Sequence, residues 1–201
     1  MKSCASVLMA TALVFVMGML SGCASPWMKP TQVINPSPNY AVVNFLRPSW
    51  IVGRIDFWVW DQDDLVGVLT SNNYIQYKAV PGEHIFIVDA WNSVAIKANV
   101  VAGKSYYVRA TSRMSWAGLT NVFLEVLKPD DTRIDAWLAS LKPIALDTTR
   151  WDVEMKKCES DSSSQITQQA CNLQNKLHQD IVTGVQNGKI AFLLMNPEDG
   201  R

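Results

Sequence analysis

The chain has 201 residues, with 18 basic and 18 acidic side chains, so it carries no formal net charge at pH 7. Nucleic acid is an unsuitable partner, because the sequence offers no basic stripe to neutralise phosphates. The same charge balance argues against purely electrostatic attachment to anionic lipid, so a membrane attachment would need another source.

The first 22 residues have the pattern of a signal peptide. Lys2 is followed by an apolar run from Val7 to Leu20, which is short for a transmembrane helix but typical of a signal-peptide core. The next residues, Leu20-Ser21-Gly22-Cys23, resemble the lipobox of bacterial lipoproteins. The resemblance implies cleavage between Gly22 and Cys23 and acylation of Cys23.

Acyl chains on Cys23 would anchor the protein in a lipid bilayer, because each buried CH₂ contributes about 0.8 kcal/mol. The alternatives are an ordinary secretory signal and an uncleaved anchor. Ala24 resembles the sorting residue that releases lipoproteins to the outer membrane in enteric bacteria. We therefore expect a lipid-anchored protein of the cell envelope, on the outer membrane and facing the periplasm.

Without residues 1–22, the remaining 179 residues are enough for one domain with a real core. Residues 23–39 contain four prolines and little hydrophobic periodicity. They are predicted to form a Pro-rich tether that holds the domain off the bilayer.

Residues 40–128 are predicted to form a β-domain. Short β-branched and aromatic runs predict strands near 40–47, 54–60, 65–69, 74–79, 83–90, 94–101, 105–112 and 119–127. Asn72-Asn73, Pro81-Gly82 and Ala102-Gly103-Lys104 mark tight turns between them. Such short links demand antiparallel neighbours, because a parallel crossover needs about a dozen residues or more, so the prediction is a mainly β, antiparallel β-sandwich or flattened barrel. Its expected core includes Phe45, Phe57 or Trp58, Ile85 or Phe86, Val108 and Phe123.

Residues 129–201 are predicted to form a helical C-terminal extension. Ile134, Trp137, Leu138 and Leu141 have helical spacing, with Asp130 or Asp131 as N-cap and Pro143 as a stop. A second stripe contains Trp151, Met155 and Cys158. A third helix begins at the Ser162/Gln165 capping box and ends at Asn187-Gly188. Residues 190–195 form either a last strand or a buried apolar tail.

Several segments of the β-domain carry a family resemblance: Val42–Pro48, Asp56–Gly67, Tyr74–Tyr77, Val80–His84 and Ala102–Val108. Together they resemble the DUF2846 family, bacterial and often lipid-anchored envelope proteins of unknown function. The Pro-Gly-Glu-His segment is also similar to the turn of PEGA-type β-modules. The resemblance covers residues 40–128 and brings no catalytic or ligand residues with it.

Motifs for catalysis or metal binding are weak. Gly103-Lys104-Ser105 lacks the first glycine of a P-loop and precedes a strand, which indicates a turn. Asp61, Asp63 and Asp64 are followed by Leu65 and Val66 where a calcium loop needs a ligand and a glycine, which favours a solvated hairpin tip. His84 and His178 are the only histidines, too few for a zinc set. We predict no enzyme activity, no metal and no cofactor.

Two classes of function remain open on the sequence. The favoured one is a non-enzymatic structural or protein-interaction module with an envelope protein as partner. The alternative is a binding domain for glycan, peptidoglycan or a hydrophobic envelope ligand, because Trp58 and Trp60 could form a platform for sugar rings. Exposure of these residues and Trp116 would favour glycan, whereas such pairs more often fill a sandwich core.

Cys158 and Cys171 are predicted to form a disulfide. Cys4 leaves with the signal and Cys23 is acylated, so these two are the remaining thiols in an oxidising compartment. The bridge would clip two helices that flank residues 161–164. Two separate buried thiols are the alternative.

Overall fold

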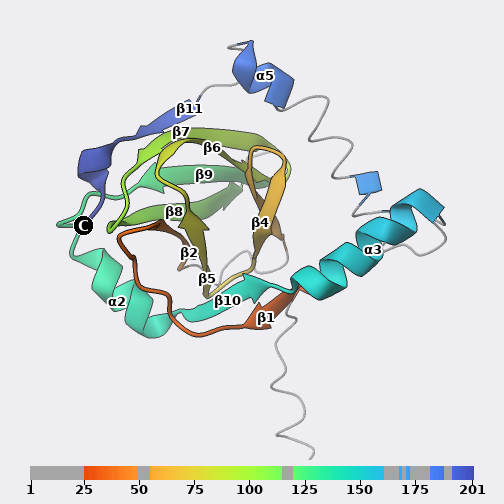
Figure 1. Ribbon diagram of the computed structural model, residues 1–201, viewed down its shortest axis with the longest axis horizontal. Coiled ribbons are helices and arrows are strands. Elements are labelled where there is room, and N and C mark those ends of the chain that lie inside the picture. The colour runs from red at the N-terminus through yellow and green to blue at the C-terminus, as the bar shows by residue number, and fades with distance from the viewer. Residues whose placement is uncertain are drawn as a thin grey trace, which may run out of the picture.

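The computed structural model describes residues 25–48, 55–114, 120–160, 168, 171–172, 182–187 and 192–201 (Figure 1). A six-stranded sheet contains, in spatial order, β1 (Met28–Pro30), β10 (Lys142–Leu146), β5 (Asn73–Ala79), β2 (Ala41–Arg47), β8 (Ser105–Met114) and β9 (Thr120–Val126). A five-stranded sheet contains β11 (Phe192–Met195), β7 (Ser93–Val100), β6 (Gly82–Asp89), β3 (Phe57–Asp61) and β4 (Asp64–Leu69). The two sheets form a sandwich, so the predicted mainly β fold class is confirmed.

The eight strands predicted between residues 40 and 127 are present as β2 to β9. Strand β2 shows the physical reason for strand formation most clearly, because it is buried along its whole length. The Phe45 ring lies 5.4 Å from that of Phe86 on β6, between the two sheets. Leu46 points to the opposite side of β2 and packs in a second cluster with Ile134 and Leu141. Both faces of the strand therefore bury apolar surface.

The pairing of the strands is mixed, which corrects the expectation of an antiparallel sandwich. The hairpins β3–β4, β6–β7 and β8–β9 are antiparallel, as their short links require. However, β2 pairs with β8, β5 with β10, and β7 with β11 in parallel. Each parallel pair joins segments far apart in the chain, and the strands between them supply the long crossover that parallel pairing needs.

The three predicted turns connect different sheets rather than hairpin strands. Asn72 and Gly103 adopt positive φ angles of 59° and 79°, which agrees with the turn chemistry expected for asparagine and glycine. Each turn nevertheless takes the chain from one sheet to the other: β4 to β5, β5 to β6, and β7 to β8. A tight turn alone therefore does not specify which strands pair.

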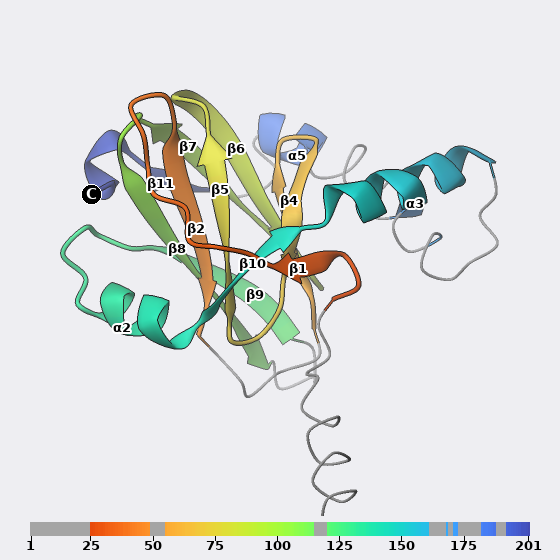
Figure 2. The ribbon, with the colours of Figure 1, turned by 60° about the horizontal axis from the view of Figure 1, so that its bottom comes forward.

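Both segments that flank the predicted β-domain add strands to it. Residues 28–30, within the predicted tether, form β1 and pair with β10. Strands β10 and β11 come from the predicted helical extension and join different sheets. Figure 2 shows β1 and β10 side by side at one end of the six-stranded sheet, with α3 (Thr148–Ser160) following β10. Residue 128 therefore does not separate two independently packed parts of the chain.

The other helical elements of the C-terminal segment are α2 (Arg133–Ser140), α5 (Val182–Gln186) and the 3₁₀ helix η2 (Pro197–Asp199). Helix α2 matches its predicted stripe and ends at Ser140, and β10 begins at Lys142, one residue before Pro143. The Ser162/Gln165 capping box lies outside the described residues, and α5 falls within the predicted third helix. Strand β11 confirms the strand alternative for residues 190–195. Among the described residues, no helix has the length and hydropathy needed to cross a membrane.

The predicted core is confirmed except at one position. Phe45, Phe57, Phe86 and Val108 are fully buried, whereas Phe123 on β9 is 43% exposed. Because side chains alternate along a strand, the burial of Val122 points the neighbouring Phe123 outward. The Arg113 guanidinium lies 5.0 Å from the Phe123 ring centroid on that outer face. The prediction for Phe123 was therefore wrong.

Candidate functional site

Several residues singled out from the sequence fall outside the described part of the chain. These are Gly22 and Cys23 of the lipobox, together with Trp116 and His178. The backbone of Cys158 lies in α3, but its side chain is also outside the description. Acylation of Cys23 and the disulfide between Cys158 and Cys171 therefore stay predictions.

Trp58 and Trp60 are buried, with 6% and 1% of their surfaces exposed. Their positions follow from the pairing of β3 with β6, in which Asp61 lies opposite Phe86. Phe86 faces the six-stranded sheet, and directly opposed residues of an antiparallel pair share a face. Alternation then places Trp58 and Trp60 on the outer face of the five-stranded sheet. They are buried as predicted, but not between the sheets.

Two further tryptophans contact this pair. The ring of Trp151, at the start of α3, lies 6.1 Å from that of Trp58 and 6.4 Å from that of Trp60. Trp27 packs edge-on against Trp151 at 5.4 Å between ring centroids. We call Trp27, Trp58, Trp60 and Trp151 the tryptophan cluster. It joins the N-terminal segment, the five-stranded sheet and α3 at one place.

Backbone contacts fix Trp27 in the tryptophan cluster. Its carbonyl oxygen accepts the Asp147 N–H at 2.8 Å, just before α3 begins. The next residue, Met28, accepts the Val68 N–H through its Sδ atom at 3.1 Å. Trp27 itself is only 4% exposed. The N-terminal segment is therefore held against the sandwich from Trp27 onward.

His84 forms a pair with Asp61 near the end of β3. Its Nδ1 lies 2.6 Å from Asp61 Oδ2, and its Nε2 lies 2.7 Å from the Val80 carbonyl oxygen. Both partners are acceptors, so both ring nitrogens must donate, which requires the imidazolium form. The hydrogen bond to Asp61 raises the pKa of His84, although burial opposes the shift. With both nitrogens engaged, His84 offers no free nitrogen to a metal or to a substrate proton.

The surroundings of this pair are aromatic and acidic. The His84 ring stacks on Phe86 with an interplanar angle of 2°. Tyr77 on β5 has a strongly raised pKa, because it is buried and lies near the Asp61 carboxylate. Asp63 and Asp64 are exposed at the hairpin tip, as predicted, whereas Asp61 is 7% exposed and belongs to the interior.

Arg47 is a buried cation at the end of β2, and only 1% of its surface is exposed. Its Nη1 donates to the carbonyl oxygens of Ile55 and Leu69 at 2.6 and 2.8 Å. The guanidinium lies 3.8 Å from the centroid of the Phe57 ring. Burial lowers the pKa of Arg47 to about 10, so it remains charged near neutral pH. Arg47 therefore joins β2 to the strands of the other sheet.

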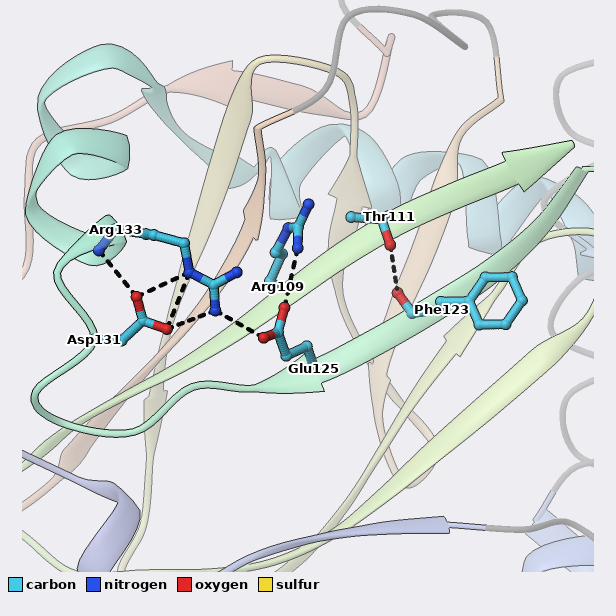
Figure 3. A network of polar contacts seen from close by, with 6 residues as sticks. All are labelled: Arg109, Thr111, Phe123, Glu125, Asp131 and Arg133. Atoms are coloured by element: carbon cyan, nitrogen blue, oxygen red, sulfur yellow. Dashed lines mark hydrogen bonds and ion pairs between the residues drawn. The ribbon is translucent and has the colours of Figure 1, made fainter.

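A polar network connects the outer face of β8 and β9 to α2 (Figure 3). Glu125 accepts hydrogen bonds from Arg109 at 3.1 Å and from Arg133 at 2.7 Å. Arg133 also binds Asp131, whose carboxylate accepts the Arg133 backbone N–H at 2.9 Å. Thr132 holds the N-cap position, so the predicted N-cap at Asp130 or Asp131 was wrong, although Asp131 still accepts an N–H of the first turn of α2. Both arginines lie near the face of the Trp137 ring on α2.

The charges of this network satisfy one another. The hydrogen bonds from Arg133 and then Arg109 lower the pKa of Glu125, although burial opposes the shift. Hydrogen bonds from Arg133 lower the pKa of Asp131 to about 2. The network therefore holds α2 on the sheet, and its paired charges favour a structural role.

Strand β11 presents the most apolar edge of the sandwich. Phe192, Leu193 and Leu194 are 46%, 37% and 58% exposed. Met195, the last residue of β11, is instead buried in the core, which fixes the strand against β7. Strand β11 ends the strand order of its sheet, so among the described residues no strand pairs with it on the side away from β7, although β11 also contacts β9 of the other sheet.

The other three sheet edges are protected. On β9, the Asn92 side chain accepts the Val122 N–H at 2.6 Å and donates to its carbonyl oxygen at 3.1 Å. On β4, the Val68 N–H binds Met28 Sδ. Strand β1 is three residues long and ends at Pro30, which has no N–H. Such devices prevent the addition of further strands, so β11 differs from the other edges.

Sequence reasoning identified part of this arrangement. It placed Trp151 on an apolar helical stripe and considered Trp58 and Trp60 together. It missed Trp27, although the apolar pair Trp27-Met28 in a segment otherwise rich in proline was a signal for burial. It also missed β11 as an exposed edge, because an apolar run does not show which side faces solvent. Among the described residues, no cluster of three metal-ligating side chains is present.

Comparison with known proteins gives no assignment. No model of a known protein family matches the chain, and no curated protein is similar enough to match. The resemblance to the DUF2846 family therefore stays a prediction.

Proposed function

We propose that this chain is a lipid-anchored protein of the bacterial envelope that acts as a non-enzymatic interaction module. The lipobox at Leu20–Cys23 supports the anchor, and Ala24 supports the periplasmic face of the outer membrane as its location. The domain would bind an extended segment of another envelope protein along β11.

The observation that carries this proposal is the contrast between β11 and the other edges. Three edges are protected, by Asn92, by Met28 and by the short β1. Strand β11 instead exposes Phe192, Leu193 and Leu194. An extended partner could pair with this backbone and cover the apolar side chains, which is a common mode of peptide recognition. Leaving such an edge bare would promote aggregation.

The glycan alternative loses the support of Trp58 and Trp60. A platform for sugar rings requires exposed aromatic faces, and both Trp58 and Trp60 are buried. Their burial under Trp151 serves packing of α3 against the sheet. The proposal therefore assigns the domain to protein contacts.

The test is site-specific photo-crosslinking in intact envelopes, with a photoreactive residue at Leu194 or at Val80. Val80 is the matched control, because it is an apolar residue with 70% exposure outside β11. We expect one discrete crosslinked protein from Leu194, lost on introduction of Phe192→Lys, and none from Val80. Equal products from both positions, or products unaffected by Phe192→Lys, would exclude recognition along β11.

A further inference from the structure

The chain enters the fold almost immediately after the proposed lipidation site. Ser25 is 5% exposed, and its carbonyl oxygen accepts the Met28 N–H at 3.1 Å. Trp27 follows in the tryptophan cluster, and β1 begins at Met28. In the sequence, only Ala24 separates Cys23 from Ser25.

The reach of this connection is short. An extended chain spans at most about 3.3–3.6 Å per residue, so the Cα atoms of Cys23 and Ser25 lie within about 7 Å. The headgroup region of one bilayer leaflet is itself roughly 5–7 Å thick. A free tether from Cys23 to Asn39 would instead reach on the order of 50 Å. The fold therefore leaves no room for a spacer between lipid and domain.

We propose that the side of the sandwich around β1 and the first turn of α3 is seated against the lipid headgroups. This inference rests on the proposed acylation of Cys23. We call five exposed residues on this side the headgroup surface: Pro26, Lys29, Thr148, Thr149 and Arg150. Lys29 forms an ion pair with Asp147 at 3.3 Å, beside the backbone contact that holds Trp27.

The strand order determines which parts stand away from the bilayer. Strand β9 is five positions from β1 in the six-stranded sheet, which corresponds to about 24 Å along the sheet at the usual strand spacing. In the other sheet, β4 contacts β10 on the anchored side, and β11 lies at the far end. The seated orientation therefore directs β11 away from the membrane.

Trp27 keeps the connection short. Its ring contacts Trp151 and its carbonyl oxygen binds Asp147, so it fixes the segment that follows the anchor. Loss of the ring would release this segment and lengthen the free chain behind Cys23. The domain would then move away from the headgroups while remaining acylated.

The test uses mature, acylated full-length protein in vesicles of phosphatidylethanolamine and phosphatidylglycerol. A photoreactive residue replaces either Lys29 on the headgroup surface or Asn121 on β9, and phospholipid adducts are measured by mass spectrometry. We expect at least tenfold more adduct from Lys29 than from Asn121. Equal yields from an acylated, vesicle-bound protein would overturn the seated orientation. A protein without acyl mass that fails to float with the vesicles would instead refute the anchor.

A second arm tests the role of Trp27 with the probe kept at Lys29. Trp27→Ala should reduce the lipid adduct severalfold, whereas Trp91→Ala should not. Trp91 is the matched control, because it is 67% exposed on the β6–β7 hairpin. Circular dichroism verifies folding of both variants. An unchanged yield of lipid adduct in folded Trp27→Ala would contradict the role of Trp27 in keeping the connection short. The orientation itself is decided by the comparison of Lys29 with Asn121, which needs neither variant.

Discussion

Raising the pH should destabilise the fold through His84. The imidazolium donates to Asp61 and to the Val80 carbonyl oxygen, and the hydrogen bond to Asp61 raises its folded-state pKa. A group with a raised folded-state pKa stabilises the fold fully below its unfolded pKa, which is about 6.5 for histidine. That stabilisation is lost as the pH rises through the folded-state pKa of His84.

The size of the effect follows from the two contacts. A hydrogen bond to a charged group contributes about 1.5–3 kcal/mol, and burial of the imidazolium offsets part of it, so we take about 1.5 kcal/mol. In a domain of this size, 1 kcal/mol shifts the melting temperature by about 2–4 °C. The difference in melting temperature between the native chain and His84→Gln should therefore change by about 3–6 °C, to the disadvantage of the native chain, as the pH rises.

The assay is thermal unfolding by circular dichroism between pH 5.5 and 9, with the native chain and His84→Gln measured side by side. The difference between the two removes the contributions of groups that titrate in both proteins. It should favour the native chain at low pH and shrink as the pH rises. A difference that is constant with pH, or that grows with it, would refute the assignment of an imidazolium at His84.

Other predictions concern the core, the thiols and the anchor. Phe45→Ala should cost about 3–5 kcal/mol of unfolding free energy, whereas Phe123→Ala should cost less than about 1 kcal/mol, measured by denaturant unfolding. Mass spectrometry of the non-reduced mature protein should detect a disulfide between Cys158 and Cys171. Reduction of this disulfide should lower the free energy of unfolding by about 3 kcal/mol in the chain-entropy model. Two thiols that can both be alkylated without reduction would exclude the bridge. Cys23→Ala should abolish acyl labelling, and labelling that survives would place the lipid elsewhere.

The sequence was sufficient for the strands of the central β-domain, because alternation and β-branched runs carry that information locally. All eight predicted strands have counterparts in β2 to β9. The pairing of these strands could not be predicted as well from the sequence. Tight turns such as Pro81-Gly82 were interpreted as hairpins, but they cross between sheets, and nothing local distinguishes the two cases.

The short terminal strands depend on partners distant in sequence. Residues 28–30 and 142–146 form β1 and β10 by pairing with each other, so neither segment shows a long periodic pattern of its own. The prediction of Pro143 as a helix stop is correct for α2, but the same residue is the second residue of β10. The candidate interaction edge at β11 was predicted as a strand or tail, yet its exposure depends on the order of the sheet.

The position of β10 and β11 late in the chain has a kinetic consequence. Each pairs in parallel with a strand made much earlier, β5 or β7, and contacts between such distant segments form slowly. The six-stranded sheet is incomplete until β10 has been made, and the five-stranded sheet is incomplete until β11 has been made. A newly made chain should therefore fold more slowly than its size alone suggests.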